Sequence, residues 1–247
     1  MTRRFLGQRV VVTGASRGLG RGCALAFAAE GARVLLIARK RAELDGVATE
    51  IRTAGGVAEA VPCDVTQPDQ VQAALSSLDR CDVLVNNAGS NRPQPFVAVD
   101  QKTLDELLAL NVRAVFTTAQ IAARFMVRQR SGVIINMSSQ MGHVGAANRT
   151  VYCMTKHAVE GLTKAMAVEL GPLGIRVNSI APTFVETPMT QPFLANEEFR
   201  REVLSRIPLG RIGSIEEVVA SVLFVASPAA ALINGTSLLV DGGYTAQ

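Results

Sequence analysis

The sequence predicts an α/β protein in which a doubly wound parallel sheet is covered by helices on both faces. Short runs rich in Val, Ile and Leu alternate with longer segments of helical periodicity along the chain. The short runs are apolar at consecutive positions, as expected for strands buried on both faces of a parallel sheet. A glycine-rich segment follows the first run directly, and such a segment commonly leads a strand into a helix.

Seven short runs have the length and composition of strands, so we expect a sheet of about seven strands. These runs are residues 9–13, 33–38, 57–61, 82–86, 132–138, 175–180 and 237–241. Helical stretches fall between them, at residues 18–30, 41–54, 68–78, 101–129, 150–171 and 215–226, with a short piece near 196–206. Ser214 followed by Glu217 matches a capping box at the start of the last helix. This alternation implies right-handed crossovers and a ligand crevice at the carboxyl ends of the strands.

Composition narrows the classes of function. The net charge is +4 and the basic residues are scattered, so a nucleic-acid interface is not indicated. The first residues lack the apolar core of a signal peptide, and no segment is long and apolar enough to cross a bilayer. The four cysteines lack metal-ligand spacing, and we expect reduced thiols. The sequence therefore predicts a cytoplasmic protein that binds no metal, nucleic acid or membrane.

The glycine-rich segment has the chemistry of an anion site. Gly14, Gly18 and Gly20 follow the first strand with the spacing TGxxxGxG, which differs from the common GxGxxG pattern. Glycines allow a tight turn and a close approach of a diphosphate, and the helix beyond them presents free N–H groups. In this position after the first strand, nucleotide binding is the better interpretation than a purely structural turn.

Tyr152 and Lys156 form a candidate proton-transfer pair. Positions i and i+4 lie on one face of a helix, so the phenol and the ammonium should be neighbours. A free tyrosine has a pKa of about 10, and a nearby cation favours the phenolate. We therefore expect Lys156 to lower the pKa of Tyr152 and to make it a proton donor and acceptor for a C–O–H group.

The ordered motifs of the chain resemble those of the short-chain dehydrogenase/reductase family, in its classical type. They are TGASRGLG at 13–20, CDV at 63–65, NNAG at 86–89, Asn111 in LNVRAVF, Ser138-Ser139, Tyr152-x-x-x-Lys156, APTFVETPM from Ala181 and DGG at 241–243. The resemblance implies one Rossmann-type catalytic domain over residues 1–247. Its cofactor half would span roughly 1–130 and its catalytic and substrate half roughly 131–247, with a substrate lid near 183–213.

The family's activity is NAD(P)-dependent hydride transfer between a ketone or aldehyde and a secondary alcohol, as in carbonyl reductases and alcohol dehydrogenases. By this resemblance Ser139 binds the substrate oxygen and Tyr152 passes the proton. Lys156 lowers the phenol pKa and holds the nicotinamide ribose, while Asn111 anchors a water that links Lys156 to solvent. Hydride transfer needs this pairing of an acid/base with an oxygen-binding donor.

The resemblance also assigns the cofactor-binding residues. They are Gly14, Ser16, Arg17, Gly18, Leu19, Gly20, Arg39, Lys40, Asp64, Val65, Asn86, Ala88, Gly89, Tyr152, Lys156, Pro182, Val185 and Thr187. Relatives that prefer NAD(H) place an acidic residue after the second strand, where this chain has Ala38 followed by Arg39 and Lys40. Arginine makes charge-assisted bonds to phosphate. We therefore expect NADP(H) to be preferred, with NAD(H) as the other candidate.

Several features leave the substrate open. Thr183 replaces a glycine that the family often has after Pro182, and this adds bulk near the substrate. His143, Asn148 and Arg149 either bind a polar substrate or are solvated loop residues.

Two other functions are weighed against a small-molecule carbonyl reductase. A 3-oxoacyl-(acyl-carrier-protein) reductase is the first alternative: Arg128 and Arg130 could dock an acidic carrier, but Leu173 stands where those enzymes often have arginine. A non-catalytic nucleotide-binding protein is the remote alternative.

The helices expected at 101–129 and 150–171 suggest self-association. They have more apolar positions than one buried face requires. Similar family members pair these helices across a two-fold axis, and we predict a homotetramer.

Overall fold

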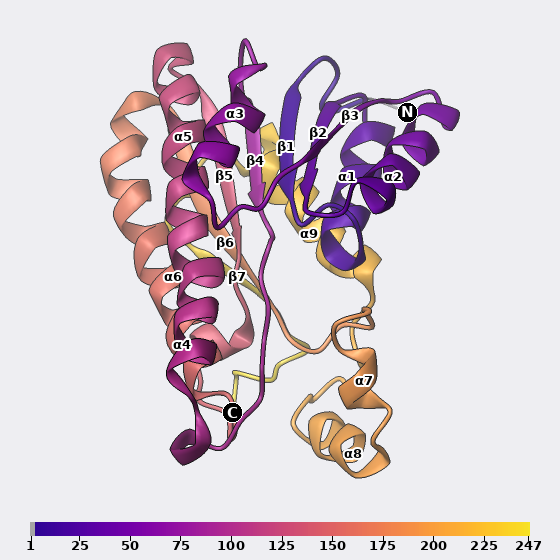
Figure 1. The fold of residues 1–247 in the computed structure, drawn as a ribbon, viewed down its shortest axis with the longest axis vertical. Coiled ribbons are helices and arrows are strands. Elements are labelled where there is room, and N and C mark those ends of the chain that lie inside the picture. Colours follow the sequence, from indigo (N-terminus) through magenta and orange to yellow (C-terminus); the bar gives the residue numbers. More distant parts are fainter. Residues whose placement is uncertain (1–2) are drawn as a thin grey trace.

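A parallel sheet between two layers of helices forms the centre of the protein (Figure 1). The computed structural model describes residues 3–247, and within this range seven strands have the order β3-β2-β1-β4-β5-β6-β7. Their bounds are Arg9–Thr13 (β1), Arg33–Ala38 (β2), Val57–Pro62 (β3), Val83–Asn86 (β4), Gly132–Met137 (β5), Ile175–Pro182 (β6) and Ser237–Val240 (β7). All neighbouring strands are parallel. The predicted fold class and all seven strands are confirmed.

Each face of the sheet has its own helices and its own apolar core. One face is covered by α1 (Gly18–Ala29), α2 (Arg41–Thr53) and α9 (Ile215–Ala226), the other by α3 (Pro68–Ser76), α5 (Ala114–Gln129) and α6 (Thr150–Leu170). Successive strand residues point to opposite faces, so Val10 and Val12 enter the first core and Val11 enters the second. This two-sided burial is the reason that the strands are apolar at consecutive positions.

The helical stretch expected at 101–129 is confirmed, and it contains a π-helical turn that the sequence pattern did not predict. It consists of α4 (Gln101–Leu108), a π-helical turn at Ala109–Arg113, and α5. Asn111 lies inside the π turn and is fully buried. π turns are rare and frequently occur at functional sites. Apolar periodicity continues through this turn, so the sequence pattern does not reveal it.

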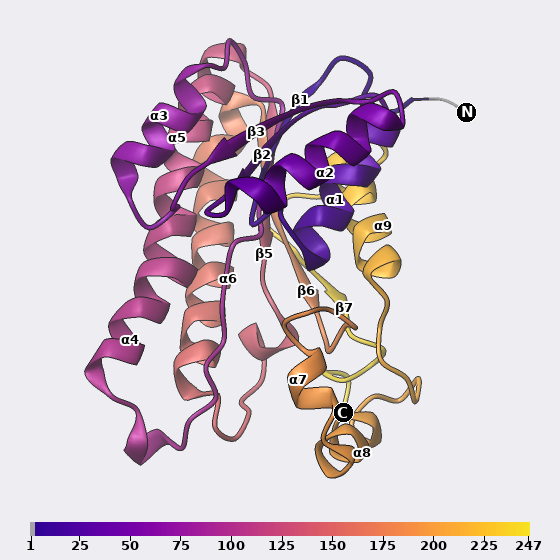
Figure 2. The same ribbon diagram turned by 45° about the vertical axis from the view of Figure 1, so that its right-hand side comes forward.

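The long segment 183–213 contains two short helices that lie apart from the two main layers (Figure 2). These helices are α7 (Gln191–Leu194) and α8 (Glu197–Ser205), and α8 confirms the helical piece expected near 196–206. The segment 183–213, called the lid here after the sequence prediction, packs in a third apolar cluster with Met141 and Cys153. The lid ends where Ser214 and Glu217 form the expected capping box of α9. No helix within residues 3–247 is both long and apolar enough to cross a membrane.

Candidate active site

An elongated pocket follows the carboxyl ends of the strands. Its volume is about 620 Å³, within the usual range for ligand sites. Six strands place residues in it at or directly beyond their last positions, namely Gly14 after β1, Arg39 after β2, Cys63 after β3, Asn87 after β4, Ser138 after β5 and Pro182 at the end of β6. The parallel sheet thereby gathers segments that are far apart in the sequence along one edge.

The turn at Gly14–Gly20, at one end of the pocket, requires glycine at several positions. Gly14 and Gly18 have φ values of 65° and 55°, a region that favours glycine. A Cβ atom on Gly20 would lie 2.2 Å from the Gly14 carbonyl oxygen, so Gly20 allows α1 to start against β1. Asn87 Nδ2 donates to the Thr13 carbonyl at 2.9 Å and fixes the turn to the end of β4. These contacts form a backbone cradle of the kind that binds a diphosphate.

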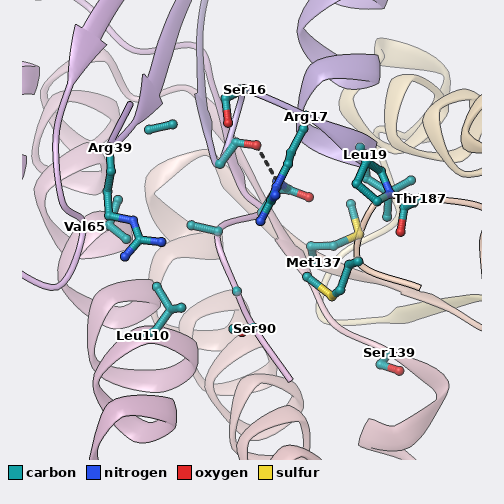
Figure 3. A pocket seen from close by; sticks show the side chains of 18 of the residues that line it. Ser16, Arg17, Leu19, Arg39, Val65, Ser90, Leu110, Met137, Ser139 and Thr187 are labelled. Atoms are coloured by element: carbon teal, nitrogen blue, oxygen red, sulfur yellow. Dashed lines mark hydrogen bonds between the residues drawn. The ribbon is translucent and has the colours of Figure 1, made fainter. Parts of the chain in front are cut away.

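Two arginines face this end of the pocket from separate loops (Figure 3). Among the described residues, neither Arg17 nor Arg39 forms an ion pair. Lys40 is different, because its Nζ lies 2.8 Å from Glu43 Oε1. Glu43 also lines the pocket, and the sequence analysis did not predict this carboxylate. Lys40 pairs with Glu43, and neither arginine has a carboxylate within ion-pair distance among the described residues.

The middle of the pocket is formed by the loops after β3 and β4. Asp64 and Val65 line it, and Asp64 Oδ1 accepts hydrogen bonds from the N–H and hydroxyl of Thr66. Ala88 lines it too, but Asn86 does not. The Asn86 side chain instead donates to the Val115 carbonyl and to Asn136 inside the core.

Ser139, Tyr152 and Lys156 meet at the other end of the pocket. Lys156 Nζ lies 5.5 Å from the centre of the Tyr152 ring, so the two residues share one face of α6 as predicted. The same Nζ donates to the Met137 carbonyl at 2.7 Å, at the end of β5. Ser139 is the second residue beyond this strand, and its Oγ donates to Gln140 Oε1 at 2.7 Å. The end of β5 thus positions both Ser139, by chain connectivity, and Lys156, by the hydrogen bond to Met137.

Burial dominates the protonation of this group. It raises the pKa of Tyr152 to about 12, although hydrogen bonding by Ser139 and the charge of Arg149 act in the opposite direction. We expected Lys156 to lower this pKa, and the net direction is the reverse. Burial also lowers the pKa of Lys156 to about 8, with the Glu160 carboxylate acting against it. At neutral pH the phenol is therefore a proton donor beside a charged ammonium.

Asn111 connects the loop after β4 to α6. Its Nδ2 donates to the Ser90 carbonyl at 2.8 Å and to Thr155 Oγ1 at 3.2 Å, while its Oδ1 accepts from the Ser90 N–H. A Cβ atom on Gly89 would lie 3.4 Å from Asn111 Oδ1 and 3.9 Å from Lys156 Nζ. Asn111 thus lies close to Lys156 but outside the pocket lining.

The structure brings together nearly all of the residues predicted from the sequence. Gly20, Asn86 and Asn111 lie outside the pocket lining, and the other predicted catalytic and cofactor residues line it. Sequence reasoning missed several lining residues: Glu43, Cys63, Thr66, Asn87, Ser90, Arg92, Glu106, Leu110, Met137, Met189 and Thr190. The position of Asn87, one residue beyond a strand, was the signal available for it. Arg92, in the loop after β4, forms an ion pair with Glu106 on α4. No local sequence pattern predicts this ion pair.

The three undecided residues between Ser139 and Tyr152 separate into two kinds. His143 and Asn148 are exposed, and His143 lies 3.5 Å from Glu160. Arg149 is buried, with 6% of its surface exposed.

The chain is similar to known proteins along nearly its whole length. A family model described as enoyl-(acyl carrier protein) reductase matches residues 14–245. L-xylulose reductase from Bos taurus is 42% identical over 247 residues, 100% of both chains. A 3-oxoacyl-[acyl-carrier-protein] reductase from Thermotoga maritima is 38% identical over 97% of this chain and 98% of that protein. The crystal structure of gluconate 5-dehydrogenase from Burkholderia cenocepacia in complex with NADP and tartrate has a TM-score of 0.95 at 33% identity, over 100% of this chain and 98% of that chain.

The fold, the site and these likenesses define an oxidoreductase with a Rossmann-type sheet. The chain belongs to the short-chain dehydrogenase/reductase family.

Proposed function

We propose that the protein is an NADP(H)-dependent oxidoreductase that interconverts a polyhydroxylated ketone and its secondary alcohol. The observation that supports this most is the shared pocket, which joins a glycine cradle and two free arginines to Ser139, Tyr152 and Lys156. The cradle excludes side chains and the pocket is elongated, so the residues present fit a dinucleotide. The relatives named reductases of sugars and dehydrogenases of sugar acids support the polyhydroxylated substrate.

Some residues of the pocket bind the cofactor, and others bind the substrate oxygen and transfer its proton. Arg17 and Arg39 hold the adenosine 2′-phosphate, and the Gly14–Gly20 turn holds the diphosphate. When bound, the cofactor supplies the hydride. Ser139 donates a hydrogen bond to the substrate oxygen, and Tyr152, protonated because of its raised pKa, gives this oxygen its proton. Lys156 places its positive charge beside the phenol, and Asn111 positions the loop next to Lys156.

Oxidation of NADPH in the presence of a carbonyl panel tests this proposal. The panel contains ketoses, keto acids and a 3-oxoacyl thioester, each assayed with NADPH and with NADH. Turnover of a polyhydroxylated ketone with NADPH is the expected result. No turnover of any carbonyl with either cofactor would overturn the proposal.

The second candidate function is 3-oxoacyl-(acyl-carrier-protein) reduction, which the Thermotoga maritima relative favours. The two residues expected to dock a carrier are exposed and each makes a contact within the chain. Arg128 stacks over the Phe125 ring at 4.8 Å, and Arg130 Nη2 donates to the Pro172 carbonyl. Faster turnover of the 3-oxoacyl thioester than of any ketose or keto acid would favour this candidate.

The low pKa of Lys156 predicts a decline of carbonyl reduction in alkaline solution. A lysine whose pKa is about 8 is charged below that pH and loses its proton as the pH rises through it. The kcat/KM for reduction should therefore fall above about pH 8, while Tyr152, with a pKa of about 12, remains protonated. A Lys156→Arg variant keeps its charge throughout this range. Its pH profile should lack the decline, and an identical decline in the variant would contradict the assignment.

We further propose a homotetramer built on two apolar surfaces. Many apolar residues of α5 and α6 are buried within the chain, but Phe116, Met154 and Val168 remain 50%, 47% and 80% exposed. Phe224 on α9 and Leu239 on the edge strand β7 are each 41% exposed, and we assign both to a second interface. Two different two-fold interfaces generate 222 symmetry. Light scattering at micromolar concentration should give a tetramer mass, and Phe116→Glu should reduce it to a dimer; a monomeric wild-type protein would contradict the proposal.

A further inference from the structure

Arg149 is a buried cation for which the chain provides no counter-charge. It is the residue directly before α6, and only 6% of its surface is exposed. Among residues 3–247 its guanidinium forms no ion pair, and it donates no side-chain hydrogen bond. Burial lowers its pKa, which is the direction expected for a desolvated charge without a carboxylate partner. A buried charge is unfavourable unless it is paired.

Two aromatic rings of the lid hold this guanidinium in place. Its Cζ lies 5.0 Å from the centre of the Phe193 ring on α7 and 5.9 Å from that of Phe199 on α8. Phe199 in turn packs edge-on against Phe184 at 5.7 Å. Cation–π contacts orient an arginine but leave its N–H donors free for a ligand. The lid thus encloses an oriented set of donors.

The guanidinium is adjacent to the proposed proton donor. Arg149 directly precedes α6, three positions before Tyr152, and lies behind the residues that line the pocket. Their charges act on each other, since each affects the pKa of the other. A second polar group in the adjoining pocket is also without a partner, because Thr183 Oγ1 is buried and makes no hydrogen bond within the described residues.

We infer that Arg149 binds the carboxylate of the substrate, so that the reaction interconverts a hydroxy acid and a keto acid. This inference rests on the proposed function, because it takes Tyr152 as the point where the carbonyl oxygen lies. A carboxylate supplies the missing counter-charge and matches the planar guanidinium in two parallel hydrogen bonds. One arginine between two phenyl rings suits a planar, singly charged group. A phosphate would require more donors than this enclosure offers.

A matched pair of carbonyl substrates tests the inference. 5-Keto-D-gluconate and L-sorbose differ only in having a carboxylate or a CH₂OH group at the end remote from the ketone. The wild-type protein should show a higher kcat/KM for the keto acid. Arg149→Gln should lower the ratio of the two kcat/KM values roughly 10- to 100-fold, the range for a lost hydrogen bond to a charged group. Most of that change should appear in KM for the keto acid.

Two variants separate this effect from general damage. Arg149→Lys keeps the charge and should retain part of the preference for the keto acid. Arg201→Gln removes an equal charge from the exposed surface of α8 and should leave the ratio unchanged. An unchanged ratio in Arg149→Gln, or a wild-type preference for L-sorbose, would overturn the inference. Preference for D-fructose 6-phosphate over the keto acid would overturn the choice of a carboxylate.

Binding measurements distinguish this inference from the proposed function. Calorimetric titration of D-gluconate and of D-sorbitol into protein saturated with NADPH requires no turnover, because an alcohol cannot react with the reduced cofactor. Gluconate binding that exceeds sorbitol binding and is lost in Arg149→Gln supports the carboxylate site even if no carbonyl is reduced. If the wild-type protein reduces L-sorbose but shows no gluconate binding, the proposed function stands and the carboxylate site is wrong.

Discussion

Replacing Tyr152 by Phe should reduce the turnover of carbonyl reduction by about 10² to 10⁴, the usual contribution of positioned acid/base catalysis. The substitution removes the phenolic O–H and preserves the ring that packs beside Lys156. Because burial keeps this phenol protonated, its loss removes the proton donor rather than a charge. Single-turnover rates with NADPH would measure the change directly, free of product release.

The second tyrosine of the chain provides the control. Tyr244 lies with the third apolar cluster and not in the pocket lining, so Tyr244→Phe makes the same chemical change outside the site. It should leave turnover within a few-fold of wild type. NADPH binding should survive in both variants. Near-normal turnover in Tyr152→Phe, with chemistry limiting the rate, would remove Tyr152 from the mechanism.

Arg39→Asp should reverse the choice of cofactor. Arg39 faces the pocket without a carboxylate partner, and the 2′-phosphate is the only group that distinguishes NADPH from NADH (Figure 3). Loss of a charge-assisted hydrogen bond, followed by repulsion from the new carboxylate, should raise KM for NADPH roughly 100-fold or more. KM for NADH should change little, since Asp can accept hydrogen bonds from both ribose hydroxyls.

Arg33→Asp tests whether net charge alone explains such an effect. Arg33 is exposed at the opposite end of β2, so the same charge reversal is made on the same strand but far from the pocket. The NADPH to NADH preference of this variant should match the wild type. Equal kcat/KM values for the two cofactors in the wild-type protein would contradict the assignment of Arg39.

Local sequence patterns predicted the parts of the site that lie at strand ends. A buried strand followed by glycine, asparagine or serine is visible in the sequence, and parallel strands bring those ends together. Glu43, Met189 and the ion pair of Arg92 with Glu106 come from helices and the lid, and their approach depends on tertiary packing. The π turn at Asn111 was hidden because both its flanks keep the helical pattern.

The pKa values of the proposed catalytic pair, Tyr152 and Lys156, likewise depend on tertiary packing that local sequence patterns do not describe. The i, i+4 spacing correctly placed Lys156 beside Tyr152. Spacing contains no information on desolvation, which depends on every segment packed around the pair. Burial therefore reversed the expected direction of the Tyr152 pKa.

The third apolar cluster has a consequence for the dynamics of the lid. It is small and separate from the two cores of the sheet, so the lid should open with a local free energy well below that of global unfolding. Opening would hydrate the Arg149 guanidinium, and closing would desolvate it again. The positive charge of Arg149 therefore disfavours closure of the lid unless a bound anion neutralises it. The equilibrium between the open and closed lid would then depend on the charge of the bound substrate. Substrates that lack a carboxylate should leave the amides of α7 and α8 accessible to hydrogen exchange. A substrate with a carboxylate should protect these amides.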